Sequence, residues 1–449
     1  MQYDVVIIGA GPGGLAAAKG AKDAGAEKVI VLERDDRAGG ILNQCIHDGF
    51  GLIRYGEQLT GPEYARRAEK EASGAEIMLG HQVVSISKNK EVTAISKDGL
   101  KKFQAKAIIL STGCRERTRG AISIPGSRPA GVFTAGVVQN LVNVKNVMPG
   151  KNVVILGSGD VGMIMARRLT LEGARVKAVI EILPEPAGLA RNVQQCLYDF
   201  DIPIKCKHTV SKIIGKKKIE AVEISAVDEM MKSIKGTEEI ISCDCLILSV
   251  GLIPENEVAE TAGVALNVKT NGAETDEFLQ TNVSGIFSCG NSRKIMDLAD
   301  FVSQQGELAG RNAVALINGQ PMKSWKETAS SSMKKGYPIP GTVTCSLCPN
   351  GCQIKWDGQS YTGNKCQRGI AFAEQERTAP KRIFTTTTRI IMNNKYRLLP
   401  VRTQKPIDKK QIISVMKELV DKCTVSPIHI GNTIYKINDT EIIATTDNI

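Results

Sequence analysis

Four short apolar runs divide the first half of the chain into two similar blocks. Residues 5–8 and 29–32 bracket the first block, and residues 153–156 and 178–180 bracket the second. The leading run of each block passes directly into a glycine-rich turn and then into a helix-forming stretch. Short apolar runs bounded by turn residues predict buried strands. Each block is therefore expected to form a strand–turn–helix–strand unit of a parallel sheet.

The two turns share one glycine spacing and one distance to an acid. The spacing is seen in Gly9-Ala-Gly11-Pro12-Gly13-Gly14 and in Gly157-Ser-Gly159-Asp160-Val161-Gly162. In each block an acid follows the second apolar run, 24 positions after the first glycine (33 − 9 and 181 − 157). These acids are Glu33 and Glu181.

This pattern suits dinucleotide binding. The first glycine permits a tight turn, the second lets the backbone approach a pyrophosphate, and the third lets the helix pack on the strand. The helix N-terminus attracts phosphate, and the acid accepts hydrogen bonds from ribose hydroxyls. A turn that merely joins a strand to a helix is the alternative, and it explains two matched copies poorly. Glu181 would repel a 2′-phosphate, which favours NAD(H) over NADP(H).

Two later segments add to the pattern: an apolar run ends in Thr112-Gly113, and another ends in Gly290-Asn291. With these, residues 1–320 resemble the pyridine nucleotide–disulfide oxidoreductase superfamily, especially its thioredoxin-reductase-like branch. The resemblance implies FAD at the first turn and NAD(H) at the second. In that family the last segment is Gly-Asp, so Asn291 keeps hydrogen bonding and drops a charge.

The resemblance also implies the binding residues. For FAD they are Gly9, Gly11, Pro12, Gly13, Gly14, Glu33, Arg34, Gly40, Gln44, Cys45, Val83, Thr112, Gly113, Gly290, Asn291 and Val302. For NAD(H) they are Gly157, Gly159, Asp160, Val161, Gly162, Glu181 and Gly251.

The redox cysteine pair of the disulfide reductases is missing. One branch carries its cysteines two and seven residues after a Gly-Gly pair, and here those positions hold Leu42 and His47. The other branch uses a CxxC, which residues 157–250 lack. Cys45 and His47 are the catalytic candidates near the flavin. The alternatives are that Cys45 is a small apolar filler and that His47 orients a loop.

Four cysteines stand near the C-terminus in the pattern C-x2-C-x3-C-x13-C, as Cys345, Cys348, Cys352 and Cys366. Four thiolates this close can surround a soft metal centre. An iron–sulfur cluster, [4Fe–4S] rather than [2Fe–2S], is favoured, and structural zinc and free thiols are the alternatives. The pattern resembles the start of molybdopterin oxidoreductases, where similar cysteines hold a [4Fe–4S] cluster.

Residues 336–449 resemble a small cysteine-bearing domain of unknown function that accompanies flavoproteins of this kind. The resemblance rests on Cys348-Pro-Asn-Gly-Cys352, the run Gly363 to Gly369 and Pro400-Val-Arg-Thr403. Such flavoproteins resemble the NAD-linked electron-transfer subunits of multi-subunit dehydrogenases. In those assemblies a separate flavoprotein oxidises glycerol 3-phosphate or an amino or imino acid.

Charge is uneven along the chain. The net charge is +11, and residues 321–449 carry 20 lysines and arginines against 10 acids. Nucleic acid is not expected, because aromatic residues are only 4% and do not alternate with the basic ones. A thiolate-bound cluster, an acidic partner, a phosphorylated substrate or a plain solvated surface would each account for the excess.

The start of the chain and its apolar stretches bear on location. The first strand is expected by residue 4, which leaves no room for a signal peptide. No charge-free apolar stretch reaches the roughly 18 residues of a membrane span. A cytoplasmic protein is expected, either free or in a complex at the membrane periphery.

The sequence thus predicts an α/β fold with two Rossmann-like dinucleotide-binding domains and a small α+β C-terminal four-cysteine metal module. The expected FAD-binding domain covers 1–118 and 251–320, the NAD(H)-binding domain 119–250, a linker 321–341 and the module 342–449. Strands are expected at 382–392 and 433–437 around one amphipathic helix, 409–422. Its apolar face is expected to hold Ile412, Ile413, Met416, Leu419 and Val420.

The expected function is an FAD-dependent NAD(H) oxidoreductase with an iron–sulfur module. It would serve as the electron-transfer subunit of a hetero-oligomeric dehydrogenase, such as a glycerol-3-phosphate dehydrogenase complex, beside a partner flavoprotein. One alternative is a stand-alone NADH oxidase or NADH:acceptor reductase with a structural zinc tail. Another is a scaffold subunit that binds cofactors without catalysis.

Overall fold

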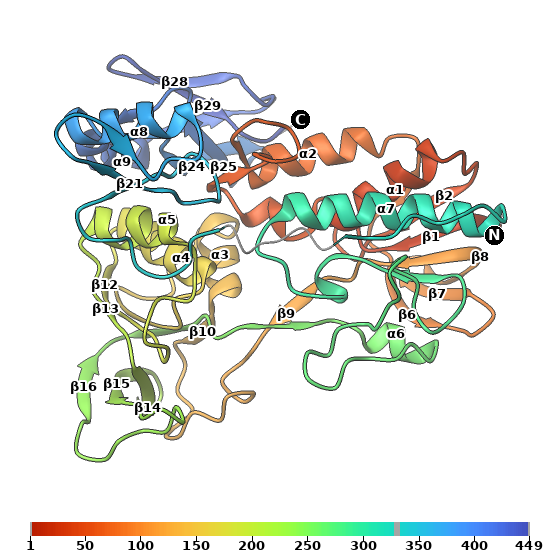
Figure 1. The fold of residues 1–449 in the computed structure, drawn as a ribbon, viewed down its shortest axis with the longest axis horizontal. Helices are drawn as coiled ribbons and strands as arrows, with labels where there is room; N and C mark the ends of the chain where they lie inside the picture. Colours follow the sequence, from red (N-terminus) through yellow and green to blue (C-terminus); the bar gives the residue numbers. More distant parts are fainter. Residues whose placement is uncertain (1, 327–332, 448–449) are drawn as a thin grey trace. The chain divides into compact units, whose positions relative to one another are not determined.

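The computed structural model describes residues 2–326 and 333–447 (Figure 1). The described chain forms two compact units. The first comprises residues 2–115 and 252–326, and the second comprises residues 116–251 and 333–447. Two short strands lie where the chain passes between the units, β9 (Cys114–Glu116) and β18 (Leu252–Pro254).

A seven-stranded sheet forms the centre of the first unit, which we call the first Rossmann domain. Its order is β5-β2-β1-β8-β7-β6, and β19 also pairs with β8. The pairs β1–β2, β1–β8, β2–β5 and β19–β8 are parallel, whereas β7 and β6 pair antiparallel. The strands are β1 (Gln2–Ile8), β2 (Val29–Leu32), β5 (Glu76–Met78), β6 (Gln82–Ile86), β7 (Glu91–Ser96), β8 (Gly99–Leu110) and β19 (Ile286–Ser288).

Helices α1 (Pro12–Asp23) and α7 (Ala299–Ile317) lie side by side against this sheet (Figure 1). Small residues allow their backbones to meet. An added Cβ at Gly306 would lie 2.1 Å from Gly13 O, and one at Gly310 would lie 2.1 Å from Ala17 O. The close approach fixes the start of α7 next to the first glycine-rich turn. The other elements are η1 (Gly40–Gln44), β3 (Asp48–Phe50), β4 (Leu59–Thr60), α2 (Gly61–Glu71), α6 (Glu257–Thr261) and η4 (Gly290–Ser292).

The second unit contains a second Rossmann domain. Its five-stranded parallel sheet has the order β10-β17-β11-β12-β13. An antiparallel sheet, β14-β15-β16, is inserted between β13 and β17. The elements are β10 (Val132–Thr134), α3 (Ala135–Asn143), β11 (Asn152–Leu156), α4 (Asp160–Leu171), β12 (Arg175–Ile180), α5 (Ala190–Asn192), η2 (Val193–Leu197), η3 (Tyr198–Phe200), β13 (Ile204–Lys205), β14 (His208–Gly215), β15 (Ile219–Ala226), β16 (Glu239–Ser242) and β17 (Cys245–Leu248).

Residues 333–447 form the C-terminal module of this second unit. A five-stranded sheet, β27-β24-β25-β29-β28, carries helix α9 (Ile412–Val420). A smaller sheet, β20-β21-β22, carries the cysteines beside helix α8 (Gln367–Thr378). The remaining bounds are β20 (Val343–Thr344), β21 (Gln353–Trp356), β22 (Tyr361–Thr362), β23 (Lys381–Arg382), β24 (Thr385–Met392), β25 (Lys395–Thr403), β26 (Ile407–Asp408), η6 (Lys409–Gln411), β27 (Cys423–Val425), β28 (Thr433–Ile437) and β29 (Thr440–Ala444).

The prediction of one amphipathic helix in the module was wrong in two respects. The described residues contain a second helix, α8, which follows directly after Cys366. On α9, Ile413 and Val420 are 44% and 47% exposed, while Val415 is buried with Ile412. Positions 412, 415, 416 and 419 follow the three-to-four-residue period of one helix face, and 413 and 420 fall beside it.

A buried arginine joins the module to the second Rossmann domain. Arg168 of α4 is 5% exposed and pairs with Glu172 at 2.7 Å. It also donates to Asn143 Oδ1 at 2.9 Å and to the hydroxyls of Thr386 and Thr387 on β24 at 3.1 and 3.0 Å. Apolar side chains from both parts share one core around these contacts. The module is therefore docked through specific, desolvated contacts.

The predicted fold class is confirmed, with two Rossmann-type sheets and a strand-rich C-terminal module bearing four cysteines. None of the helices in the described ranges is long and apolar enough to cross a membrane.

Candidate functional site: two glycine-rich turns and a four-cysteine module

The first glycine-rich turn connects β1 to α1. Gly9 has φ of 98°, and an added Cβ there would lie 2.6 Å from Ser111 O. A Cβ on Gly14 would lie 1.8 Å from Gly9 O. Gly11, in contrast, has no atom within 4 Å of its Cβ position and caps α1 without a side-chain hydrogen bond. The middle of the turn faces open space beside a helix N-terminus, which fits a pyrophosphate.

The second turn, between β11 and α4, repeats this geometry. Gly157 has φ of 96°, and its added Cβ would lie 2.1 Å from Ser249 O. A Cβ on Gly162 would lie 2.7 Å from Ser249 Cβ. At Gly159 the nearest atom would be Ser249 Oγ at 3.4 Å, which is an ordinary contact. The second turn is therefore uncrowded at its middle glycine, although less open than the first.

The two acids occupy equivalent, buried positions. Glu33 and Glu181 are 5% and 4% exposed. Glu33 accepts hydrogen bonds from Ala10 N at 2.7 Å and Asp35 N at 2.9 Å. Glu181 accepts from Ser158 N at 2.8 Å and Leu183 N at 2.9 Å. Each carboxylate thus ties its glycine-rich turn to the loop after the second strand, a role that the sequence did not reveal.

Two serines complete the turns, and the sequence analysis missed them. Ser111 donates its hydroxyl to Ile8 O at 2.8 Å and Gly9 O at 2.9 Å. Ser249 Oγ accepts from Gly162 N at 3.1 Å. Both serines follow the strand beside the turn, β8 or β17, in the tetrapeptide Leu-Ser-x-Gly at 110–113 and 248–251. That shared tetrapeptide is the signal that could have found them.

Loops from the rest of the first Rossmann domain surround the first turn. A Cβ on Gly40 would lie 3.1 Å from Gly11 Cα. Arg34 pairs with Glu255 at 3.2 Å, and Thr112 donates to Glu255 O at 2.6 Å. Gly40 thus lies against the turn, and Glu255 links Arg34 to Thr112. Gly113 has φ of 78°, and Val83 is a buried residue of β6.

The end of β19 and the start of α7 meet the first turn through one side chain. Val302 is 3.2 Å from the Cβ position of Gly13 and 2.8 Å from that of Gly290. Asn291 donates to Cys114 Sγ at 3.4 Å and accepts from Met296 N at 3.0 Å. The predicted residues Gly13, Gly290 and Val302 are therefore brought together, although 289 positions separate the first from the last (302 − 13).

A buried glutamine beside this group was also missed. Gln305 of α7 accepts from Gly290 N at 2.7 Å. Its Nε2 is buried and has no hydrogen-bond partner among the described residues. Buried donors are nearly always satisfied, so an unsatisfied one indicates a missing acceptor. This orphan donor fits a polar group bound at the predicted flavin segment.

The region after the Gly39-Gly40 pair carries the two catalytic candidates. Leu42 is buried in the apolar core at 1% exposure, in the place of a redox thiol. Cys45 ends η1, is half-buried, and its carbonyl accepts from Gly61 N at 2.9 Å. His47 Nδ1 lies 3.1 Å from Asp48 O, and its ring packs on Phe50. Their catalytic role stays a prediction, as does flavin contact by the buried Gln44.

The remaining residues predicted for NAD(H) lie around α4. Asp160 Oδ1 accepts from Leu189 N at 2.9 Å and from Asn192 Nδ2 at 2.7 Å, which holds the loop after Glu181 against the helix. Val161 is 37% exposed at the first turn of the helix. Gly251 has φ of 105° and accepts from Arg117 N at 3.0 Å.

The four C-terminal cysteines lie in one small module. Cys345 and Cys352 are buried in a common apolar cluster, and Cys345 N donates to Cys352 O at 2.8 Å. Cys348 is half-buried, and Cys366 is exposed at the N-cap of α8. Burial raises the pKa of Cys345 to about 11, and the neighbouring thiols add to the rise. The Gly369 N–H, donated to Cys366, lowers the pKa of that thiol.

None of these four cysteines forms a disulfide, and neither do the other eight cysteines in the described residues. Within residues 2–326 and 333–447, no group of three or more His, Cys, Asp or Glu side chains is arranged to hold a metal ion. The four cysteines have the chemistry of a soft metal site. In the described structure their side chains are not arranged around one metal position.

The folds and the paired turns define a class, the oxidoreductases that bind FAD and a pyridine nucleotide in two Rossmann-type domains. The chain belongs to the pyridine nucleotide-disulphide oxidoreductase family, whose profile matches residues 3–306. A second profile, a protein family of unknown function (DUF1667), matches residues 367–446. Its match begins directly after the last of the four cysteines.

The individual proteins and the solved structure that resemble this chain are consistent with the family match. A thioredoxin reductase of Listeria innocua is 28% identical over 320 residues, covering 69% of this chain and 92% of the relative. One of the opine oxidase subunits of Agrobacterium tumefaciens is 25% identical over 369 residues, covering 75% and 69%. The crystal structure of T. acidophilum thioredoxin reductase matches with a TM-score of 0.58 at 24% identity, covering 71% and 99%. The predicted resemblance to the thioredoxin-reductase-like branch is confirmed.

Proposed function

We propose that this chain is an FAD-dependent NAD(H) oxidoreductase that serves as the electron-transfer subunit of a multi-subunit dehydrogenase. The observation that carries the proposal is the duplicated turn. Each copy pairs an uncrowded middle glycine, Gly11 or Gly159, with a buried acid, Glu33 or Glu181. Two such turns on one chain suit one tightly held and one exchangeable dinucleotide.

The two turns would hold different nucleotides. The first turn, with Val302 and Gln305, would hold the flavin nucleotide and meet it with an unsatisfied buried donor. The second turn would position NAD(H), and Glu181 would disfavour a 2′-phosphate. When bound, the flavin supplies hydride acceptance from the nicotinamide. The protein's contribution is to orient the two nucleotides and exclude water.

This chain differs from disulfide reductases in the group that would accept electrons from the flavin. Leu42 and His47 occupy the positions where one branch has its two cysteines, so a local dithiol is not available there. We propose that Cys345, Cys348, Cys352 and Cys366 hold an iron–sulfur cluster. Such a cluster, when bound, supplies one-electron transfer.

The redox setting favours a cluster over zinc, because zinc cannot carry electrons between the flavin and a partner. Zinc in a stand-alone NADH:acceptor reductase is the alternative that metal analysis of the purified chain would reveal.

A role within an assembly is supported by the relationship to the opine oxidase of Agrobacterium tumefaciens, because the name of that relative describes one part of a larger enzyme. The partner we propose is a flavoprotein dehydrogenase that handles the organic substrate, such as glycerol 3-phosphate or an amino or imino acid. The basic C-terminal part of the chain would suit an acidic surface on that partner.

The test uses the full chain purified without oxygen. We expect bound FAD, iron and acid-labile sulfide, and rapid bleaching of the flavin by NADH. Stoichiometric zinc without iron would refute the cluster, and a flavin that NADH does not reduce would refute the oxidoreductase in favour of a scaffold. Purification of the native protein with its partners, followed by mass spectrometry, tests the role in an assembly. A chain recovered alone with full NADH oxidase activity would contradict it.

A further inference from the structure

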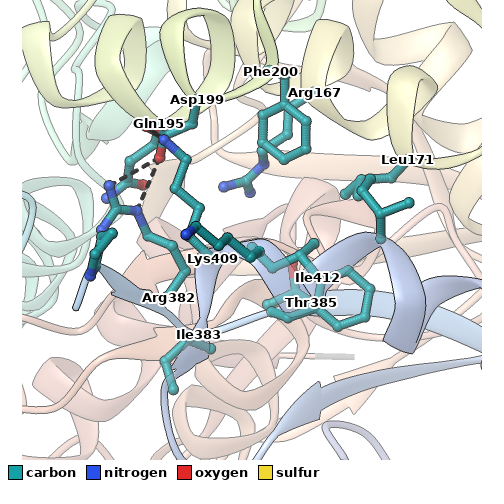
Figure 2. Close-up of a pocket in the computed structure, with 14 residues that line it drawn as sticks. Arg167, Leu171, Gln195, Asp199, Phe200, Arg382, Ile383, Thr385, Lys409 and Ile412 are labelled. Atoms are coloured by element: carbon teal, nitrogen blue, oxygen red, sulfur yellow. Dashed lines mark hydrogen bonds and ion pairs between the residues drawn. The ribbon is translucent and has the colours of Figure 1, made fainter.

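A cavity of about 360 Å³ lies inside the second unit, between the second Rossmann domain and the C-terminal module (Figure 2). One wall comes from α4 and the turns η2 and η3. The other wall comes from β23, β24 and the start of α9. The cavity is separate from both glycine-rich turns, since none of their residues lines it.

Ion pairs fix one end of the cavity. The Asp199 side chain is buried and accepts from Arg382 Nε at 3.0 Å and from Lys409 Nζ at 2.7 Å. Arg382 also pairs with Glu376 at 2.6 Å. Next to the cavity, Arg168 joins α4 to β24 through its own buried contacts. The two walls are thus held at a defined separation.

Two cations that line the cavity have no acid partner among the described residues. Arg167 is half-buried and points into the cavity past the Phe200 ring (Figure 2). Among the described residues it makes no ion pair or side-chain hydrogen bond. Lys410 is a second lining cation without an acid partner within the described chain. Asp199 is the sole carboxylate of the described lining, and Arg382 and Lys409 already use it.

The rest of the lining is mostly apolar, with Gln195 and Thr385 as its polar members. Leu171 and Phe200 face Phe384 and Ile412 across the cavity. A half-buried guanidinium beside such walls, with no acid to pair with, is stabilised when an anion binds it. Its planar fork matches a carboxylate or phosphate with two parallel hydrogen bonds. A volume at the small end of the range for ligand sites, about 300–1,000 Å³, suits a small metabolite better than a dinucleotide.

We propose that this cavity binds a small organic anion, with its carboxylate or phosphate head on Arg167 and Lys410 and its short hydrocarbon body between Phe200 and Ile412. Such a ligand would contact the second Rossmann domain and the C-terminal module at once. The proposal does not depend on the identity of the electron partner or on metal at the cysteines.

The test measures ligand binding to the full chain by calorimetry. We expect hexanoate and hexyl phosphate to bind with Kd below about 1 mM, and hexan-1-ol, acetate and inorganic phosphate to bind at least tenfold more weakly. Arg167→Gln should weaken hexanoate binding about tenfold, because a charge-assisted hydrogen bond is lost. Arg175→Gln, on an exposed arginine of the same domain outside this cavity, should leave binding unchanged.

Three results would overturn the proposal. They are no saturable hexanoate binding below about 10 mM, hexan-1-ol binding as tightly as hexanoate, or equal losses in Arg167→Gln and Arg175→Gln. Lys410→Gln alters an exposed side chain and so tests the same site should Arg167→Gln fail to fold. It should weaken hexanoate several-fold, and unchanged binding in Lys410→Gln would then count against the site.

Discussion

Replacing Arg168 by methionine should loosen the C-terminal module from the second Rossmann domain. The methionine keeps much of the apolar volume but removes a guanidinium with four acceptors. These are Glu172 at 2.7 Å, Asn143 at 2.9 Å, Thr387 at 3.0 Å and Thr386 at 3.1 Å. Two of these acceptors lie on β24 of the module, so the loss falls on the contact between the two parts.

The size of the effect follows from the burial of the partners. Breaking a buried ion pair by removing one member costs about 3–5 kcal/mol. Glu172 is 24% exposed and can regain water, which places the cost at the lower end. Asn143 is 4% exposed, so the loss of a hydrogen bond to its buried oxygen adds to the penalty. We expect about 3 kcal/mol, which corresponds to roughly a hundredfold change in a local opening equilibrium.

Hydrogen exchange followed by mass spectrometry measures this opening segment by segment. Arg168→Met should speed exchange in β24 and α9 about a hundredfold and leave FAD content unchanged. Arg167→Met is the matched control, because the side chain of this adjacent arginine makes no ion pair or hydrogen bond in the described structure. Its exchange should change less than about fivefold. Equal effects of the two substitutions, or no effect of Arg168→Met, would refute the docking role of Arg168.

Three further predictions concern the turns and the cysteines. Gly11→Ala should fold, because its Cβ meets open space, and should lower the FAD content several-fold. Gly159→Ala should keep FAD and raise the KM for NADH about tenfold, and loss of FAD in both variants would contradict this division. Glu181→Gln should lower the free energy of unfolding of the nucleotide-free protein by about 1–3 kcal/mol in denaturant, because an amide NH2 replaces a carboxylate oxygen that accepts backbone hydrogen bonds. A free energy of unfolding equal to that of the parent would disprove this role of Glu181. Cys348→Ser should remove most iron and sulfide, while Cys423→Ser, on exposed β27, should not; equal metal contents would exclude the proposed ligand.

The parts of the fold with local signals could be predicted from the sequence. The strands before and after each turn pair as expected, with Val5 beside Val29 in the first block and Val153 beside Val176 in the second. Apolar runs, glycine spacing and the position of an acid are properties of a few consecutive residues. The resemblance to a family then extended these signals to segments such as Gly290-Asn291.

The parts that depend on contacts between distant segments could not be predicted. The sequence analysis did not single out Arg168, whose partners on β24 lie 218 and 219 positions away. Helix α8 carries a weak apolar pattern after Cys366, so its periodicity gave little signal. Ser111 and Ser249 share a local tetrapeptide, but the turns on which they act are formed elsewhere in the chain, so their role was not evident from it. Such contacts arise only when the tertiary structure is assembled.

The buried acids connect nucleotide preference to the shape of the turn. A carboxylate offers about four lone-pair positions, and Glu181 already uses some of them on Ser158 N and Leu183 N. The positions that remain can accept a ribose hydroxyl, while the same charge repels a 2′-phosphate. Exchanging Glu181 alone for a residue that tolerates the phosphate would also remove the acceptor that ties the turn to the loop after β12. A change of preference to NADP(H) would therefore need a second substitution that restores this acceptor.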